Sequence, residues 1–327
     1  MDKKVSLTQI DIEKAKLLKG IAILYVLLGH MHYINWGGGG VGLFLIVSGY
    51  GINETVKRNG VANYWAKRIK AVYLPYFFVM LLFLVSFQER HGLTLLCTVL
   101  SLDFGYNVDN TMWYISFIFY WYIVYYASVA VSHVFKNEPI RTLVKAFEIV
   151  FAVPVCIYLS RRGVWHEAAA AEVYALLFPI GVLLSDLSGL KVDTKVRQIF
   201  WAVILFVCTA RLLSAYPFIG ARMRISMPMQ AVAVCMLADI GGRPGEVLKW
   251  FGNYSFSIYL FEGVFVFTYR NSWFEVLGNQ ILIDAAAIAV TMIFAWIYQE
   301  CIISMIKKIP LETISLGAHK KNGKETV

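Results

Sequence analysis

The sequence predicts an all-α, polytopic integral membrane protein with about ten transmembrane helices and both termini in the cytoplasm. Of its 327 residues, 59% are hydrophobic and only 16% are charged. An average soluble domain has about 45–50% apolar and about 25% charged residues. The third observation is that Lys and Arg concentrate in alternate predicted loops, as the positive-inside rule describes.

Ten apolar segments approach the roughly 20 residues that a helix needs to cross the hydrocarbon core. The residues before the first segment are polar, so no cleavable signal is evident and that segment is itself a span. Leu93–Leu102 is apolar but too short to span, and we expect a re-entrant or interfacial piece there. In chain order the ten segments centre on residues 17–35, 40–55, 71–88, 112–134, 143–160, 170–187, 198–215, 224–240, 251–270 and 279–305.

The orientation follows from the basic residues. Most of the 30 Lys and Arg residues fall in the loops on one side, and an even number of spans places both termini on that side. The positive-inside rule assigns it to the cytoplasm. We therefore expect a cytoplasmic N-terminal segment (1–16), a transmembrane domain (17–305) and a cytoplasmic tail (306–327). The net charge of +9 then reflects topology, and no nucleic-acid partner is expected.

His30 is the first candidate functional residue, because an ionisable side chain inside a membrane-length helix is costly to bury. At 1.5 Å per residue it lies about 16 Å beyond Lys19, in a core about 30 Å thick. Tyr33, Asn35 and a run of four glycines follow it. A neutral histidine at this depth suits general-base chemistry. A histidine that only hydrogen-bonds between helices is the alternative interpretation.

Glu262 is the only carboxylate central to the ninth segment, about 20 Å beyond Lys249. This depth matches that of His30, so the carboxylate could hold the imidazole tautomer and stabilise the imidazolium. Alternatively, Glu262 pairs with an arginine such as Arg211, or it is protonated.

Basic and aromatic residues supply the remaining candidates. Lys67, Arg68 and Lys70 lie beside aromatic residues in the second loop and could bind a phosphorylated cofactor, although positive-inside placement also explains them. Trp113 could line a sugar site or belong to an interfacial aromatic belt. The four-glycine run lacks the Gly-Lys-Ser/Thr ending of a P-loop, no HExxH motif is present, and no metal is expected.

Five motifs follow one another along the chain: Lys19 and His30, Ser48-Gly49-Tyr50, Lys67 and Lys70, Trp113-Tyr114, and Ser255 with Tyr259-Leu260. In this order and spacing, they resemble the motifs of acyltransferase family 3, whose membrane proteins acylate sugars of bacterial surface glycans. The resemblance covers nearly the whole chain, and the predicted span count agrees with it. Four positions depart from the family pattern: Lys19 replaces Arg, the loop pair is Lys67 and Lys70 instead of two arginines, and Glu262 stands where His is common.

The resemblance implies a multi-pass enzyme of the bacterial inner membrane that works among membrane lipids. It would move an acyl group, with acetyl expected, from cytoplasmic acyl-CoA to a hydroxyl of a surface glycan or lipid-linked saccharide. His30 would deprotonate that hydroxyl or relay the acyl group, with Glu262 beside it. The basic residues Lys19, Lys67, Arg68 and Lys70 would bind the donor, and Tyr33, Asn35 and Trp113 would bind the acceptor.

A transporter or flippase for a glycan-lipid or small solute is the main alternative. In that interpretation, His30 and Glu262 form a proton relay across the membrane. No convincing repeat relates the two halves of the chain, which disfavours it. A non-catalytic membrane scaffold explains the two mid-span ionisable residues least well.

Overall fold

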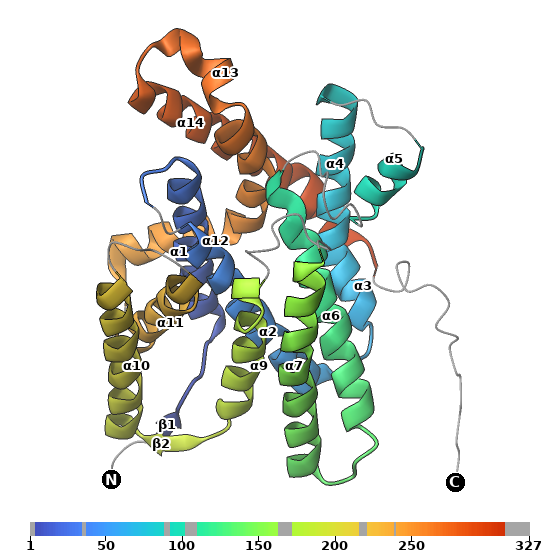
Figure 1. The fold of residues 1–327 in the computed structure, drawn as a ribbon, viewed down its shortest axis with the longest axis vertical. Coiled ribbons are helices and arrows are strands. Elements are labelled where there is room, and N and C mark those ends of the chain that lie inside the picture. The colour runs from blue at the N-terminus through green and yellow to red at the C-terminus, as the bar shows by residue number, and fades with distance from the viewer. Residues whose placement is uncertain are drawn as a thin grey trace.

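The computed structural model describes residues 4–34, 37–87, 92–101, 110–162, 172–215, 221–238 and 240–310. Within these ranges the chain is a bundle of helices with one small sheet (Figure 1). The strands β1 (Lys4–Ser6) and β2 (Lys191–Asp193) pair antiparallel, with Val5 opposite Val192. The sequence patterns did not predict this sheet, because three-residue strands are too short to show a period of two.

Every apolar segment predicted from the sequence contains a helix in the described residues. Helix α1 begins earlier than expected because the Asp11 carboxylate accepts a hydrogen bond from the Lys14 N–H (2.8 Å) and caps the helix. The short apolar stretch after the third segment forms a helix of only eight residues, α5, as its length predicts. The helices are α1 (Ile12–His30), α2 (Gly38–Asn59), α3 (Tyr64–Arg68), η1 (Ile69–Tyr73), α4 (Leu74–Phe87), α5 (Gly92–Val99), η2 (Asn110–Met112), α6 (Trp113–Ser132), α7 (Glu138–Arg161), α9 (Leu177–Leu187), α10 (Thr194–Ala215), α11 (Ala221–Leu237), α12 (Gly242–Glu262), η3 (Gly263–Thr268), α13 (Arg270–Phe274), η4 (Glu275–Leu277), α14 (Gln280–Tyr298), η5 (Gln299–Ile303) and α15 (Ser304–Lys308).

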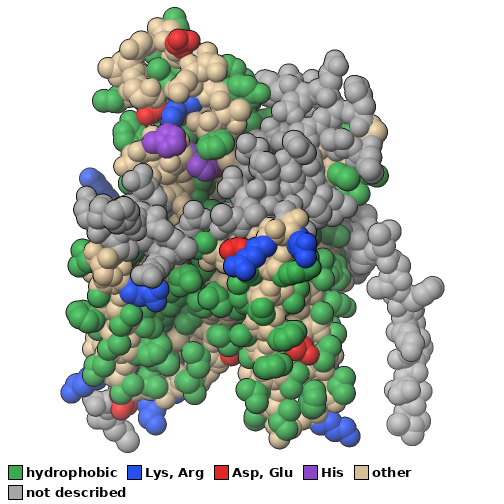
Figure 2. All heavy atoms as spheres, viewed as in Figure 1, with side chains coloured by type: hydrophobic (Ala, Val, Ile, Leu, Met, Phe, Trp, Pro, Cys, Tyr) green, Lys and Arg blue, Asp and Glu red, His purple; other side chains and the backbone are tan. Residues whose placement is uncertain are grey.

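Four of the described helical runs are long and apolar enough to cross a membrane: Trp113–Ser132, Glu138–Arg161, Thr194–Ser214 and Gln280–Lys308. Hydrophobic side chains cover the lower part of the molecule over α7, α9 and α10, and Lys and Arg lie at its lower edge (Figure 2). Exposed apolar surface of this extent fits contact with lipid. The chain is therefore a helical membrane protein, and the count of about ten spans and the cytoplasmic termini stay predictions.

Two glycine pairs allow the central helices to pack closely. A Cβ atom added at Gly20 or at Gly252 would lie closer than 3.0 Å to a backbone oxygen of the opposite helix, so only glycine fits at the α1–α12 crossing. A Cβ atom at Gly49 or at Gly181 would likewise lie closer than 3.0 Å to a backbone oxygen, so only glycine fits at the α2–α9 crossing. Small residues at helix crossings are the usual basis of close packing in membranes. Helices α1 and α12 thus run in direct contact, and each carries one of the two mid-span ionisable residues.

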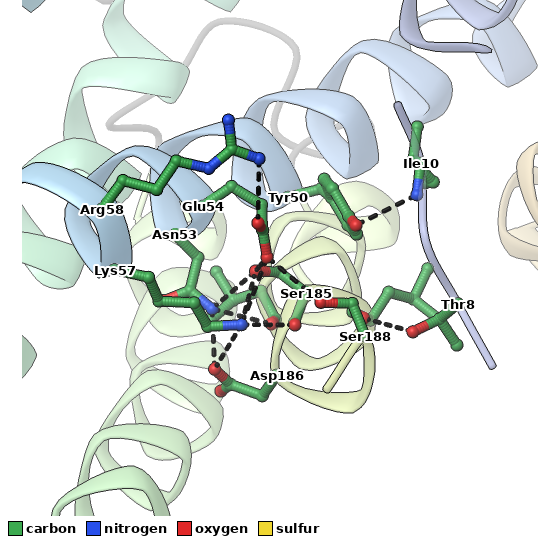
Figure 3. A network of polar contacts seen from close by, with 12 residues as sticks. Thr8, Ile10, Tyr50, Asn53, Glu54, Lys57, Arg58, Ser185, Asp186 and Ser188 are labelled. Atoms are coloured by element: carbon green, nitrogen blue, oxygen red, sulfur yellow. Dashed lines mark hydrogen bonds and ion pairs between the residues drawn. The ribbon is translucent and has the colours of Figure 1, made fainter. Parts of the chain in front are cut away.

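A buried polar network ties α2 to α9 near the sheet end of the bundle (Figure 3). Lys145 extends this network to α7. The Asn53 amide donates to Asp186 (2.7 Å), and the Lys145 ammonium donates to Asn53 Oδ1 and to Asp186 (both 2.9 Å). The side chains of Lys145 and Asp186 are only 11% and 13% exposed. The contacts among Asn53, Lys145 and Asp186 thus hold α2, α7 and α9 together.

Candidate functional site

A cavity of about 760 Å³ runs along α1 from Lys19 to His30 and on to Ile34. Its walls come mainly from α1, α2, α6 and α12. Because α1 rises 1.5 Å per residue, the part between Lys19 and His30 is about 16 Å long. The cavity therefore joins the basic end of α1 to the histidine at its other end.

His30 and Glu262 form a hydrogen-bonded pair in the wall of this cavity. His30 Nδ1 lies 2.7 Å from Glu262 Oε2. The carboxylate is fully buried, whereas 28% of the imidazole side chain is exposed. An ionised carboxylate at Nδ1 favours the tautomer with the proton on Nδ1, which makes Nε2 the basic nitrogen. Among the described residues, the Glu262 carboxylate pairs with His30 and not with Arg211, the alternative partner considered for it.

The placement of this pair follows from where two helices end. His30 is the last residue of α1, and Glu262 is the last α-helical residue of α12. Directly after Glu262 the backbone changes to the π-helical segment η3. Such π-helical turns are found frequently at functional sites. Phe267 of η3 packs its ring 4.9 Å from the imidazole, so the same segment also covers His30.

Lys19 and Arg68 line the opposite end of the cavity. Arg68, at the end of α3, places its guanidinium 5.6 Å from the Tyr122 ring centre and 5.9 Å from that of Tyr64. Its Nε is buried and has no hydrogen-bond partner among the described residues. An aromatic cradle that holds an arginine with a spare donor is suited to binding an anionic group.

Lys67 and Lys70 do not line the cavity. The Lys70 ammonium instead donates to the backbone oxygens of Lys307 (2.7 Å) and Ile309 (2.5 Å). These oxygens lie at the end of α15, where helix carbonyls lack partners within the helix. In this structure Lys70 therefore caps the last helix, and of the four predicted donor-binding residues only Lys19 and Arg68 face the cavity.

Aromatic residues also line the cavity. Trp113 lines it, and its ring stacks on that of Tyr174, with centres 5.9 Å apart and planes 18° apart. Tyr259 donates from its hydroxyl to the Thr111 carbonyl (2.7 Å), and both residues also line the cavity. Sequence reasoning missed Tyr174, since no motif marks it and only the fold brings it to Trp113.

The other two predicted acceptor residues are placed differently. Tyr33 is 54% exposed and does not line the cavity. Its hydroxyl hydrogen-bonds to Asp284 of α14. Asn35 lies outside the described residues. Across the ranges that the structure describes, no three His, Cys, Asp or Glu side chains gather as a metal ligand set.

The fold and the cavity define a class: a helical membrane protein with a histidine–carboxylate pair in the wall of an internal cavity. A protein-family model described as an acyltransferase domain matches residues 12–300, which is most of the chain and includes both members of the pair. The chain therefore belongs to acyltransferase family 3, and it is an acyltransferase. Comparisons with curated proteins and with solved structures find no match.

Proposed function

We propose that this protein transfers an acetyl group from cytoplasmic acetyl-CoA to a hydroxyl of a surface polysaccharide or lipid-linked sugar, in the bacterial inner membrane. The observation that carries the proposal is the His30–Glu262 pair: a basic ring nitrogen on a cavity wall, backed by a fully buried carboxylate at 2.7 Å. A histidine oriented by a carboxylate is the arrangement that activates a hydroxyl for acyl transfer.

In the proposed mechanism, His30 Nε2 takes the proton of the attacking sugar hydroxyl while Nδ1–H remains bonded to Glu262. The sugar oxygen forms a bond to the thioester carbonyl carbon, and the carbon–sulfur bond then breaks. The proton passes from Nε2 to the leaving thiolate, so the imidazole returns to its starting state. A positioned general base of this kind contributes about 10²- to 10⁴-fold to the rate.

The two ends of the cavity support separate roles for the two substrates. Lys19 and Arg68 would bind the donor's phosphates, because cations form strong charge-assisted hydrogen bonds with phosphate oxygens. The acyl-bearing arm would then extend along α1 for about 16 Å to reach His30. Trp113, stacked on Tyr174, offers an aromatic surface for the acceptor near the histidine.

The test is mass analysis of surface glycan from cells that carry the wild-type protein, His30→Ala, or no protein. We expect an ester-sized mass in the wild type that is lost in the other two, because without the imidazole no group takes the hydroxyl proton. Immunoblotting of membranes checks that His30→Ala is inserted at the wild-type level. Retention of the ester mass in His30→Ala would refute the proposed role of His30.

A further inference from the structure

Arg270, the first residue of α13, reaches the end of α1 that carries His30. Its Nη1 lies 3.5 Å from the backbone oxygen of His30. The Arg270 side chain is only 9% exposed, so this charge is nearly removed from water. At 3.5 Å the contact is long for a hydrogen bond, and its strength is chiefly that of a cation beside a helix end.

The backbone around His30 shows why this contact matters. The last four carbonyl groups of an α-helix have no partner within the helix. In α1, the oxygens of Leu27, Leu28 and Gly29 accept from the backbone N–H groups of residues 31–34. The His30 oxygen faces the guanidinium of Arg270 instead. Arg270 thus complements the negative end of α1 at the residue that carries the imidazole.

Asp284 of α14 holds Arg270 in place. Its Oδ1 lies 3.2 Å from Arg270 Nε, and its side chain is 5% exposed. The same oxygen accepts a hydrogen bond from the Gln280 amide (2.9 Å). A buried ion pair is costly to break from one side, because the remaining charge has no partner. Arg270 Nε is buried and makes no hydrogen bond among the described residues, so the ion pair with Asp284 is what joins the guanidinium to α14.

Two residues that flank η3, Glu262 before it and Arg270 after it, both contact His30. Glu262 binds the His30 ring at the start of η3, and Arg270 binds the His30 backbone just beyond its end. Figure 1 shows α13 and α14 beyond the end of α1, where they can hold it from outside the bundle. Neither Arg270 nor Asp284 is among the residues that line the cavity, so neither is placed to touch substrate.

We propose that Arg270 and Asp284 are positioning residues of the acyl-transfer centre. They fix the end of α1, and through it they keep the His30 imidazole aligned with Glu262 and with the reacting atoms. This inference rests on the proposed function of His30. It gives the α13–α14 region a role in catalysis, although neither Arg270 nor Asp284 lines the cavity.

The test compares Arg270→Met, Arg270→Lys and Asp284→Asn in purified full-length protein, with acetyl-CoA and an acceptor glycan. A misplacement of about 1 Å can lower a rate about 100-fold, and we expect kcat to fall by about that factor in Arg270→Met. The KM for acetyl-CoA should stay unchanged, because Lys19 and Arg68 lie at the other end of the cavity. Arg270→Lys keeps the charge and should recover part of kcat.

Lys145→Met is the matched control, because it breaks an ion pair of similar burial, Lys145–Asp186, far from His30. It should lower the melting temperature as Arg270→Met does while leaving kcat per folded molecule at the wild-type value. If Arg270→Met does not fold, Gln280→Ala leaves the ion pair in place, removes the amide that donates to Asp284 and to Asn271, and should show a smaller loss of kcat.

Two outcomes would overturn the inference: kcat of Arg270→Met close to wild type, or a loss that Lys145→Met reproduces at equal stability. His30→Ala, measured beside them, separates this inference from the proposed function. An inactive His30→Ala with an active Arg270→Met refutes only the positioning role. An active His30→Ala refutes the proposed function itself.

Discussion

At the scale of single residues, Glu262 is the most costly feature of the site. Its carboxylate is fully buried, it accepts a hydrogen bond from His30, and its Oε1 has no hydrogen-bond partner among the described residues. Burial of an ionised or under-satisfied carboxylate is unfavourable unless charges and hydrogen bonds compensate for it. Buried carboxylates of this kind cluster at functional sites, which indicates that Glu262 serves function and not stability.

Glu262→Gln should therefore separate activity from stability. The amide cannot stabilise an imidazolium as a carboxylate does, so we expect kcat to fall by about 10²- to 10⁴-fold. The melting temperature should stay at or above the wild-type value, because the neutral amide is less costly to bury. Activity assays across a pH range and thermal unfolding in detergent measure both effects. Unchanged activity with an unchanged pH profile would show that Glu262 does not act on His30.

Arg68 and Lys67 are neighbours in sequence, but only Arg68 lines the cavity. We expect Arg68→Met to raise the KM for acetyl-CoA about 10-fold or more, because a hydrogen bond to a charged group contributes about 1.5–3 kcal/mol. Lys67→Met, the matched control, should leave that KM unchanged. Initial rates at varied acetyl-CoA concentration provide the comparison. Equal effects of the two substitutions would mean that the net charge of the loop, and no specific contact, attracts the donor.

At the scale of helices, the α1–α12 crossing determines whether His30 can meet Glu262. Gly20 and Gly252 let the two backbones approach, and an ion pair between Glu13 and Lys249 (3.2 Å) joins the same helices at their other end. Helices α1 and α12 are long enough to span a membrane but are less apolar than the four candidate spans, since they carry charged and small residues. The buried residues of α1 and of the second half of α12 pack against other helices, where small and polar side chains are tolerated.

Gly252→Ala tests this crossing directly. The added methyl group would overlap the Lys16 carbonyl oxygen, and such overpacking typically costs about 1–3 kcal/mol. We expect a lower melting temperature and reduced activity. Gly51→Ala is the control, because a Cβ atom at Gly51 has nothing within 4 Å, and alanine there should be neutral or stabilising by about 0.4–1 kcal/mol. A Gly252→Ala protein as stable as the wild type would show that the crossing is looser than described.

At the scale of the whole molecule, one cavity connects a basic end to a histidine end. A cavity of this kind suits an enzyme whose two substrates arrive from opposite membrane faces. It would also suit a transporter with His30 and Glu262 as a proton relay, the alternative considered from the sequence. The family membership supports the enzyme. In the glycan analysis, an absent or truncated polymer without the protein would instead support transport.

Much of this protein could be predicted from its sequence, because the physics of each feature is local. Runs of apolar residues predict helices, and residue counts from Lys19 and Lys249 place His30 and Glu262 at the same depth. The order of the motifs predicts the family, which the family match confirms. The β1–β2 sheet was not predicted, because two strands far apart in sequence and three residues long leave no periodic pattern.

Only the tertiary structure decided which of the candidate residues contact one another or face the cavity. Depth along a helix does not specify the direction in which a side chain points, so the 2.7 Å contact of His30 with Glu262 required the α1–α12 packing. The same limit applies to the basic residues: Arg68 faces the cavity while Lys70 caps α15. Tyr174 and Arg270 reach the site from distant segments, and no spacing in the sequence encodes such long-range contacts.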